Sequence, residues 1–117
     1  MNISKEGLMK FTTISSLLEY KTLMCLLANA SEEGSTYIKQ EDIAKTLNTT
    51  RQAVNRAISQ LSKQNIFSIE KVGLRRIYHF NPDYCITDVG YKELYKKFSK
   101  YKNKSLEDTD NEQWKKH

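Results

Sequence analysis

The sequence predicts a mainly α-helical α+β fold with one small β-hairpin, in the order helix, strand, helix, helix, strand, strand, helix. Apolar residues recur at helical spacing in four segments, two short segments around Gly73 alternate apolar and polar residues, and a polar run at 48–50 separates two of the helical segments. A chain of 117 residues with 38% hydrophobic content forms one modest core. We therefore expect one domain over residues 1–102 and a disordered, charged tail over 103–117.

The first helical pattern begins at Thr12 or Ser15, and the run 15–19 offers a serine cap followed by Glu19, where the helix dipole favours an acid. Residues 1–11 show no clear pattern and form either a short arm or a first turn. Residues 23–28 are six consecutive apolar residues, which predicts burial on more than one side. This helix either is central to the core or partly meets the same helix of a second subunit.

A polar turn at 31–35 and a short strand at 36–38, which could pair with the hairpin, are expected next. Acidic residues at 41–42 then open a helix with Ile43, Ala44 and Leu47 on its apolar face. Residues 48–50 interrupt the pattern, and Thr49 or Thr50 is expected to cap the following helix.

The helix expected over residues 50–64 separates two faces sharply. The side chains that point into the core are Val54, Ala57, Ile58 and Leu61. The outer face carries no acid and consists of Thr50, Arg51, Gln52, Asn55, Arg56 and Ser59. Two short helices, a polar turn and an acid-free outer face are typical of a helix-turn-helix.

The residue types of the outer face suit nucleic acid. Arginine, glutamine and asparagine have the donor and acceptor geometry of base edges in a major groove, so Arg51, Gln52 and Asn55 are the predicted base contacts. The predicted phosphate contacts are Thr50, Arg56 and Ser59. For the arginines, the alternative is a solvated face or a pair within the helix.

The two alternating segments, 66–70 and 76–80, predict strands joined at Gly73. Lys71, Arg75 and Arg76 flank the tip, where they are expected to contact a phosphate backbone or a minor groove, unless they are simply solvated. Pro82 and its polar neighbours are expected to end the second strand.

A last helix is expected after Asp88, its predicted cap. Aromatic and aliphatic side chains form one row along it: Tyr91, Leu94, Tyr95, Phe98 and Tyr101. Lysines occupy the other face. The helix either closes the domain, forms a dimerisation helix together with the first helix, or lies on a membrane surface.

The positive charge is concentrated in the second half of the chain. The net charge is +5, and residues 49–104 carry 12 Lys and Arg against 4 Asp and Glu. This distribution favours a polyanion as partner, although a membrane surface would also attract it. The sequence has no uncharged apolar stretch of about 18 residues and no signal-peptide pattern, so we expect a cytoplasmic protein that does not span a membrane.

Catalytic and metal-binding patterns are not evident. Cys25 and Cys85 have no metal-ligand spacing; we expect buried or idle thiols, the alternatives being a redox sensor or a disulfide. His79 and His117 share no helical face. We found no phosphate-binding loop and no nucleophile motif. We therefore expect neither an enzyme nor a bound metal or cofactor.

A family resemblance supports these expectations. Residues 37–80, with Ile43, Ala44, Leu47, the run 50–58, Leu61, Ile66 and the Gly73 hairpin, resemble the winged helix-turn-helix proteins, including the MarR-like type. Residues 78–83 resemble the plasmid replication protein RepL, and the order of parts with Val72-Gly73 is loosely similar to the plasmid partition protein TubR.

The resemblance implies a protein that binds double-stranded DNA, most simply as a homodimeric transcriptional regulator. One alternative is a plasmid or phage maintenance protein, either a replication factor or a centromere-binding partition adaptor, with a protein partner from that system. The other is a winged-helix module that binds protein.

Overall fold

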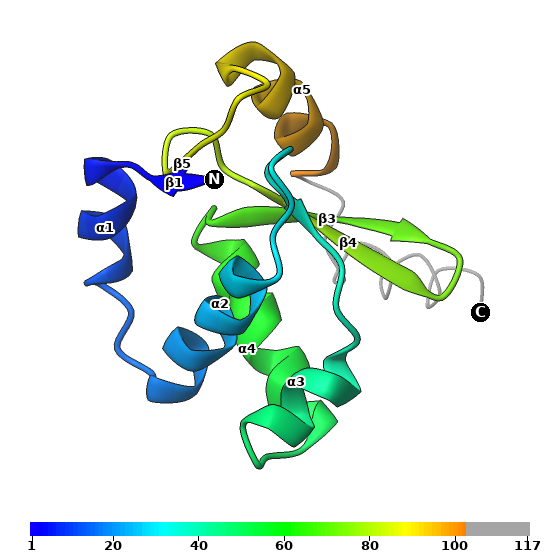
Figure 1. Ribbon diagram of the computed structural model, residues 1–117. Coiled ribbons are helices and arrows are strands. Elements are labelled where there is room, and N and C mark those ends of the chain that lie inside the picture. The colour runs from blue at the N-terminus through cyan, green and yellow to red at the C-terminus, as the bar shows by residue number, and fades with distance from the viewer. Residues whose placement is uncertain (103–117) are drawn as a thin grey trace, which may run out of the picture.

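The structure, a computed structural model, describes residues 1–102 (Figure 1). In chain order the elements are β1 (Asn2–Ile3), α1 (Lys5–Phe11), α2 (Leu17–Ala28), β2 (Ser35–Thr36), α3 (Gln40–Thr46), α4 (Arg51–Lys63), β3 (Phe67–Val72), β4 (Arg75–Phe80), β5 (Cys85–Ile86) and α5 (Tyr91–Tyr101). The predicted α+β order is confirmed. Three further elements, β1, α1 and β5, join it. The predicted tail at 103–117 lies outside the described residues.

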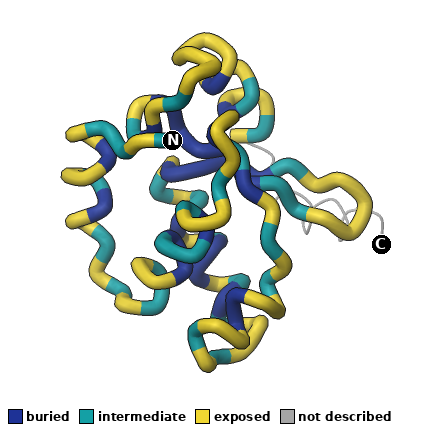
Figure 2. The backbone as a smooth tube through the Cα atoms, in the orientation of Figure 1, coloured by how far each residue is buried: buried dark blue, intermediate teal, exposed yellow. Residues whose placement is uncertain are grey.

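Helix α2 crosses α4 at the centre of the molecule (Figure 2). Ser16 caps α2 as predicted, accepting a 3.3 Å hydrogen bond from the backbone N–H of Glu19. Thr22, Leu23 and Leu26 are fully buried, whereas the other long apolar side chains of the predicted run are half-buried. One face of α2 thus belongs to the core, and a second apolar face is only partly covered.

The helix-turn-helix forms where the sequence places it. Asn48 adopts a positive φ of 54° between α3 and α4, a conformation that asparagine tolerates better than most residues. Thr50 then caps α4 by accepting a 3.1 Å hydrogen bond from the backbone N–H of Ala53. All four predicted core residues of α4 are buried. The polar face of α4 is consequently turned away from the core.

The predicted hairpin is β3 and β4, paired antiparallel from Phe67 opposite Phe80 to Val72 opposite Arg75. Gly73, with φ of 63°, begins the two-residue turn, which suits a glycine at the first position. Strand β2 pairs with the other edge of β4, as predicted for the segment after the polar turn, although it covers Ser35–Thr36 rather than 36–38. The order β2-β4-β3 puts β4 in the middle of the sheet, and the hairpin of β3 and β4 extends away from the helices (Figure 1).

The N-terminal segment, residues 2–11, packs against residues 83–86, which follow β4. β1 pairs with β5, and Ser4 caps α1 while its hydroxyl donates to the carbonyl of Asp83 at 2.7 Å. Gly7 is buried, and a Cβ there would clash with the carbonyl oxygen of Tyr84. The glycine that weakens the helical pattern therefore allows α1 to pack closely on this segment.

The predicted cap of the last helix was wrong. Gly90, not Asp88, precedes α5, with φ of 83° and no side-chain cap. The backbone there takes a left-handed conformation that glycine adopts at little cost, so the helix begins later than an Asp88 cap requires. Leu94 and Phe98 are buried, while Tyr91 is half-exposed and its hydroxyl donates to Asp83 at 2.8 Å.

A polar chain ties the three strands to α5. His79 is 2.8 Å from the hydroxyl of Ser35 through Nδ1 and 2.7 Å from a carboxylate oxygen of Glu70 through Nε2. The ring of Tyr101 stacks on the same imidazole, with centroids 5.3 Å apart. The hydrogen bond from His79 is the main reason why the pKa of Glu70 is lowered.

Candidate nucleic-acid interface

The outer face of α4 is accessible at its N-terminal end. Arg51, Gln52 and Arg56 are exposed, and Asn55 and Ser59 are half-buried. The first turn of α4 contains no acid. Thr50 is exposed at the cap position, where its hydroxyl oxygen is engaged with the backbone. The side chains on this face that a partner can reach are therefore two cations, Arg51 and Arg56, and the amide of Gln52.

A groove separates this face from the wing. Its volume is about 510 Å³, and we call it the helix–wing groove. The residues that line it are Tyr37, Ile38, Lys39, Gln40, Glu41, Arg51, Gln52, Asn55, Leu74, Arg75, Arg76 and Tyr78. The three predicted base contacts and two of the three predicted wing cations therefore share one surface.

Two predicted residues of α4 lie outside that groove. Arg56 lines a smaller hollow of about 200 Å³ between α4 and the start of α2, with Ser16 and Glu19. Ser59, one turn further along α4, lines neither space. The predicted phosphate contacts of α4 are therefore spread along the helix, whereas the predicted base contacts are gathered.

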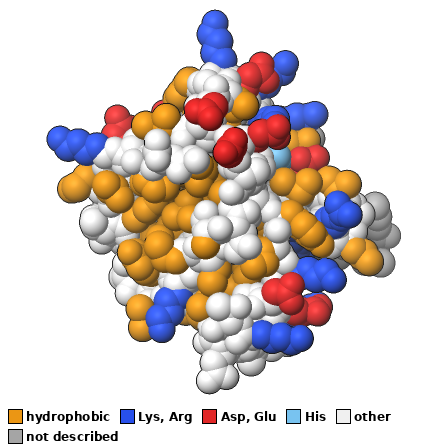
Figure 3. Space-filling view, in the orientation of Figure 1, with side chains coloured by type: hydrophobic (Ala, Val, Ile, Leu, Met, Phe, Trp, Pro, Cys, Tyr) orange, Lys and Arg blue, Asp and Glu red, His pale blue; other side chains and the backbone are white. Residues whose placement is uncertain are grey.

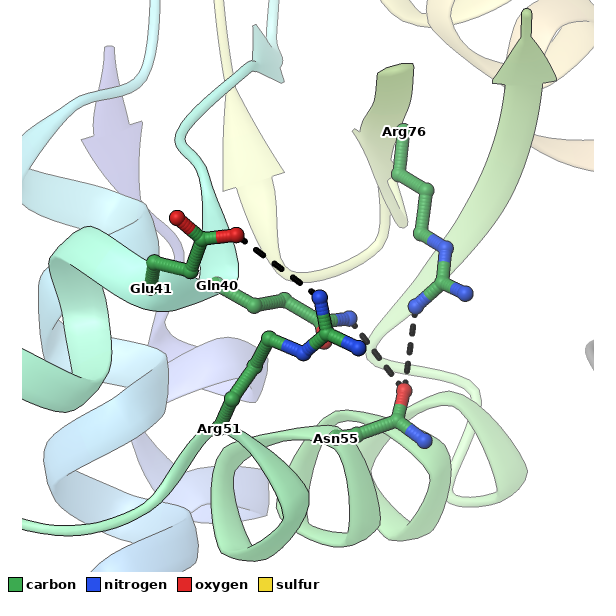
Figure 4. Close-up of polar contacts among 5 residues, drawn as sticks. All are labelled: Gln40, Glu41, Arg51, Asn55 and Arg76. Carbon is green, nitrogen blue, oxygen red and sulfur yellow. Dashed lines mark hydrogen bonds and ion pairs between the residues drawn. The ribbon is translucent and has the colours of Figure 1, made fainter. Parts of the chain in front are cut away.

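Asn55 is held by two side chains from other elements (Figure 4). Its Oδ1 accepts a 3.2 Å hydrogen bond from Nε2 of Gln40, at the start of α3, and a 3.0 Å hydrogen bond from Nη1 of Arg76 on β4. Arg76 thus points from the wing toward α4. These bonds connect the two helices of the motif with the wing.

Arg51 has an acidic neighbour, Glu41, which lies on α3 and not on α4. Its Nη1 lies 3.6 Å from Oε1 of Glu41, in the first turn of α3 (Figure 4). Both side chains are more than 60% exposed, so the pair contributes only about 0–1 kcal/mol and is screened by salt. Arg51 can therefore exchange this partner for a phosphate or a base edge.

The wing cations are in different environments. The guanidinium of Arg75 lies over the ring of Tyr37, 5.3 Å from its centroid, whereas Arg76 is directed at Asn55. Lys71 is exposed on β3. Leu74, at the tip, is fully exposed. The wing thus presents Lys71, Arg75 and an apolar tip, and uses Arg76 to contact α4.

Sequence reasoning missed Tyr37, Gln40 and Glu41. Tyr37 was considered only as part of the short strand expected at 36–38, and residues 40–42 only as the start of a helix. Gln40 is 15 residues from Asn55 and 36 residues from Arg76, so no local period connects them. Tyr78, also in the groove lining, is buried, and burial raises the pKa of its phenol.

Other chemistry is sparse in the described part of the chain. Residues 1–102 contain no group of three or more His, Cys, Asp or Glu arranged to hold a metal ion. Cys25 and Cys85 are free thiols, and burial raises the pKa of Cys85 to about 12. Cys85 is therefore a buried thiol, as expected. Within the same residues, no helix has the length and apolarity needed to cross a bilayer.

The helical core, the outward face of α4 and the adjoining antiparallel wing define a winged helix-turn-helix domain. The model of the Crp-like helix-turn-helix domain family matches residues 16–84, and the chain belongs to this family. This is a DNA-binding rather than an enzymatic type of domain. The match does not confirm the finer likeness to MarR-like proteins, RepL or TubR. No curated protein and no solved structure shows a significant match.

Proposed function

We propose that the protein is a transcriptional regulator that binds a specific sequence of double-stranded DNA. The N-terminal half of α4 enters a major groove, and the wing lies on the adjacent backbone or minor groove. The observation that carries this proposal is the exposure of Arg51 and Gln52 at the start of α4, in the same helix–wing groove that Arg75 lines. A duplex can approach both surfaces from the same side.

The exposed side chains divide into two roles. Arg51 and Gln52 contact base edges, because each carries donors at the end of α4 that would lie deepest in a groove. Arg56, Lys71 and Arg75 neutralise phosphates on either side and fix the position of the domain along the DNA. The net positive charge of residues 49–104 supports this arrangement.

The protein acts as a homodimer in this proposal. Exposed apolar side chains occur on α1, as Leu8 and Met9, and on α2, as Leu17 and Tyr20. Figure 3 shows hydrophobic side chains gathered over these two helices. On α2, the half-buried Met24 and Leu27 continue the 17, 20 pattern in steps of three and four residues, the spacing at which two helices pack along a shared stripe.

A two-fold dimer presents two copies of α4, and these would contact half-sites about one helical turn of DNA apart. Leu17→Glu should convert the dimer to a monomer by sedimentation and weaken binding to a palindromic duplex. Ser31→Glu, in the exposed turn after α2, is the matched control and should change neither. A monomeric wild-type protein would contradict the proposed dimer. The proposal would then be reduced to DNA binding by a single domain.

The regulatory role is tested by mapping the sites that the protein occupies on its own genome. Sites overlapping promoters, with a pseudo-palindromic sequence, are the expected result. Tandem repeats at an origin of replication or a centromere would contradict the regulator and favour a plasmid or phage maintenance protein. Failure of duplex DNA to bind at physiological salt would favour a winged module that binds protein.

A further inference from the structure

We propose that Asn55 contacts DNA only as a hydrogen-bond donor, and that Gln40 and Arg76 impose this by occupying its side-chain oxygen. The inference deepens the proposed function and rests on α4 entering a major groove. It concerns which bases the protein prefers at one position of its site.

The hydrogen bonds fix which end of the amide faces the protein. A carbonyl oxygen has two lone pairs, and Oδ1 of Asn55 already accepts from Gln40 at 3.2 Å and from Arg76 at 3.0 Å. A guanidinium has donors only, so the atom facing Arg76 must be the oxygen rather than the nitrogen. The amino group, Nδ2, is then the end of Asn55 left for a ligand (Figure 4).

This orientation excludes the usual contact between asparagine and adenine. That contact needs the amide to accept from N6 of adenine and donate to N7 at the same time. With Oδ1 of Asn55 occupied, the side chain can only donate. Guanine offers two acceptors in the major groove, adenine and thymine offer one each, and cytosine offers a donor alone. The expected order of preference opposite Asn55 is therefore guanine, then adenine and thymine, then cytosine.

Both partners are placed to keep Asn55 in this state. Gln40 is the first residue of α3, Arg76 is the second residue of β4, one residue pair away from the end of the hairpin, and all three side chains are at least partly buried. Partial burial limits the rotamers that each side chain can adopt and protects the bonds from competing water. Gln40 and Arg76 are therefore positioning residues for Asn55.

The test compares Arg76→Met with Arg75→Met. Each removes one wing cation, but only the first removes a donor to Asn55. A bound duplex is first selected with the wild-type protein, the base pair contacted by residue 55 is located with Asn55→Ala, and all four bases are placed there. For the wild-type protein, guanine should exceed cytosine by at least about fivefold.

Arg76→Met frees one lone pair, so the affinity for adenine relative to guanine should rise at least about fivefold. Arg75→Met should weaken binding to all four duplexes and leave that ratio unchanged. Gln40→Met removes the other donor without changing charge and should shift the ratio in the same direction as Arg76→Met. It provides the readout if the wing variant fails to fold.

Unchanged ratios in Arg76→Met and Gln40→Met would overturn the inference, as would a wild-type preference for adenine. An equal shift of the ratio in Arg75→Met would overturn it too, because the effect would then belong to charge. In these cases the wild-type protein still binds DNA and the proposed function stands. Failure of the wild-type protein to bind any duplex would overturn the function and the inference together.

Discussion

Arg51 on α4 and Glu41 on α3 form an ion pair of 3.6 Å, and both residues line the helix–wing groove. Because the pair is exposed, DNA can displace it, but the carboxylate still repels approaching phosphates. Glu41→Gln should therefore tighten duplex binding roughly several-fold at low salt, with a smaller gain at high salt. Gel-shift titrations at two salt concentrations measure the change.

Asp42→Asn is the matched control for that prediction. It removes the same charge from the next residue of α3, which does not line the groove. Its gain in affinity should be smaller than that of Glu41→Gln. Equal gains would mean that the total charge of the domain, and not the pair with Arg51, sets the effect.

Arg51→Ala should reduce discrimination between a matched and a scrambled duplex by about 1–3 kcal/mol, because a base contact supplies specificity. Arg56→Ala, in the hollow beside α2, should weaken both duplexes alike, since a phosphate contact carries no sequence information. Fluorescence anisotropy with both duplexes gives the two ratios. Equal losses on both duplexes for Arg51→Ala would end its role as a base contact.

Arg75→Ala should weaken binding to every sequence and lower the slope of log K against log salt by about 1, because one phosphate contact is lost. Tyr37→Leu removes the ring beneath the guanidinium but keeps the charge. It should weaken binding less and leave the salt slope intact. A salt slope that Arg75→Ala leaves unchanged would remove Arg75 from the interface.

Thr50→Ala should lower the free energy of unfolding by about 1 kcal/mol, because the backbone N–H of Ala53 loses its cap. Thr50→Ser retains the hydroxyl and should stay near the wild-type stability. Urea unfolding followed by circular dichroism measures both variants. Equal destabilisation in the two would show that the methyl group, not the capping oxygen, stabilises the start of α4.

The bond between Glu70 and His79 predicts a loss of stability in acid. The pKa of Glu70 lies below its ordinary value of 4.5, so its contribution is fully present above that pH and is lost as the pH falls through the lowered pKa. The stability difference between the wild-type protein and Glu70→Gln should therefore shrink as the pH falls below 4.5. Glu93→Gln, on the exposed side of α5, is the control. A difference that is constant with pH would contradict the assignment.

Local patterns were sufficient for much of the fold. The core face of α4, its threonine cap and the turn at Gly73 each depend on residues within a few positions of one another. The core face and the turn were predicted correctly, and Thr50 is one of the two threonines expected to cap the helix. Helix α1 was not predicted, because Gly7 weakens a helical pattern. The glycine is needed there because the backbone of Tyr84, which is distant in the sequence, packs too closely for a Cβ.

The candidate site was only partly predictable. The exposed Arg51 and Gln52 follow from the period of one helix, which is a local property. The two bonds to Asn55 join three elements, and the ion pair of Arg51 depends on how α3 crosses α4. Such contacts are set by tertiary packing. For this reason, the sequence predicted the same role for Arg75 and Arg76, whereas in the structure Arg75 lies over Tyr37 and Arg76 donates to Asn55.

The most direct test of the central proposal is an NMR titration of the wild-type protein with its selected duplex. The account predicts that amide shift changes concentrate at residues 50–56 of α4 and 71–76 of the wing, and that they weaken as salt is raised. Changes centred on α1 and α2, with α4 and the wing unaffected, would contradict the claim that the outer face of α4 contacts DNA.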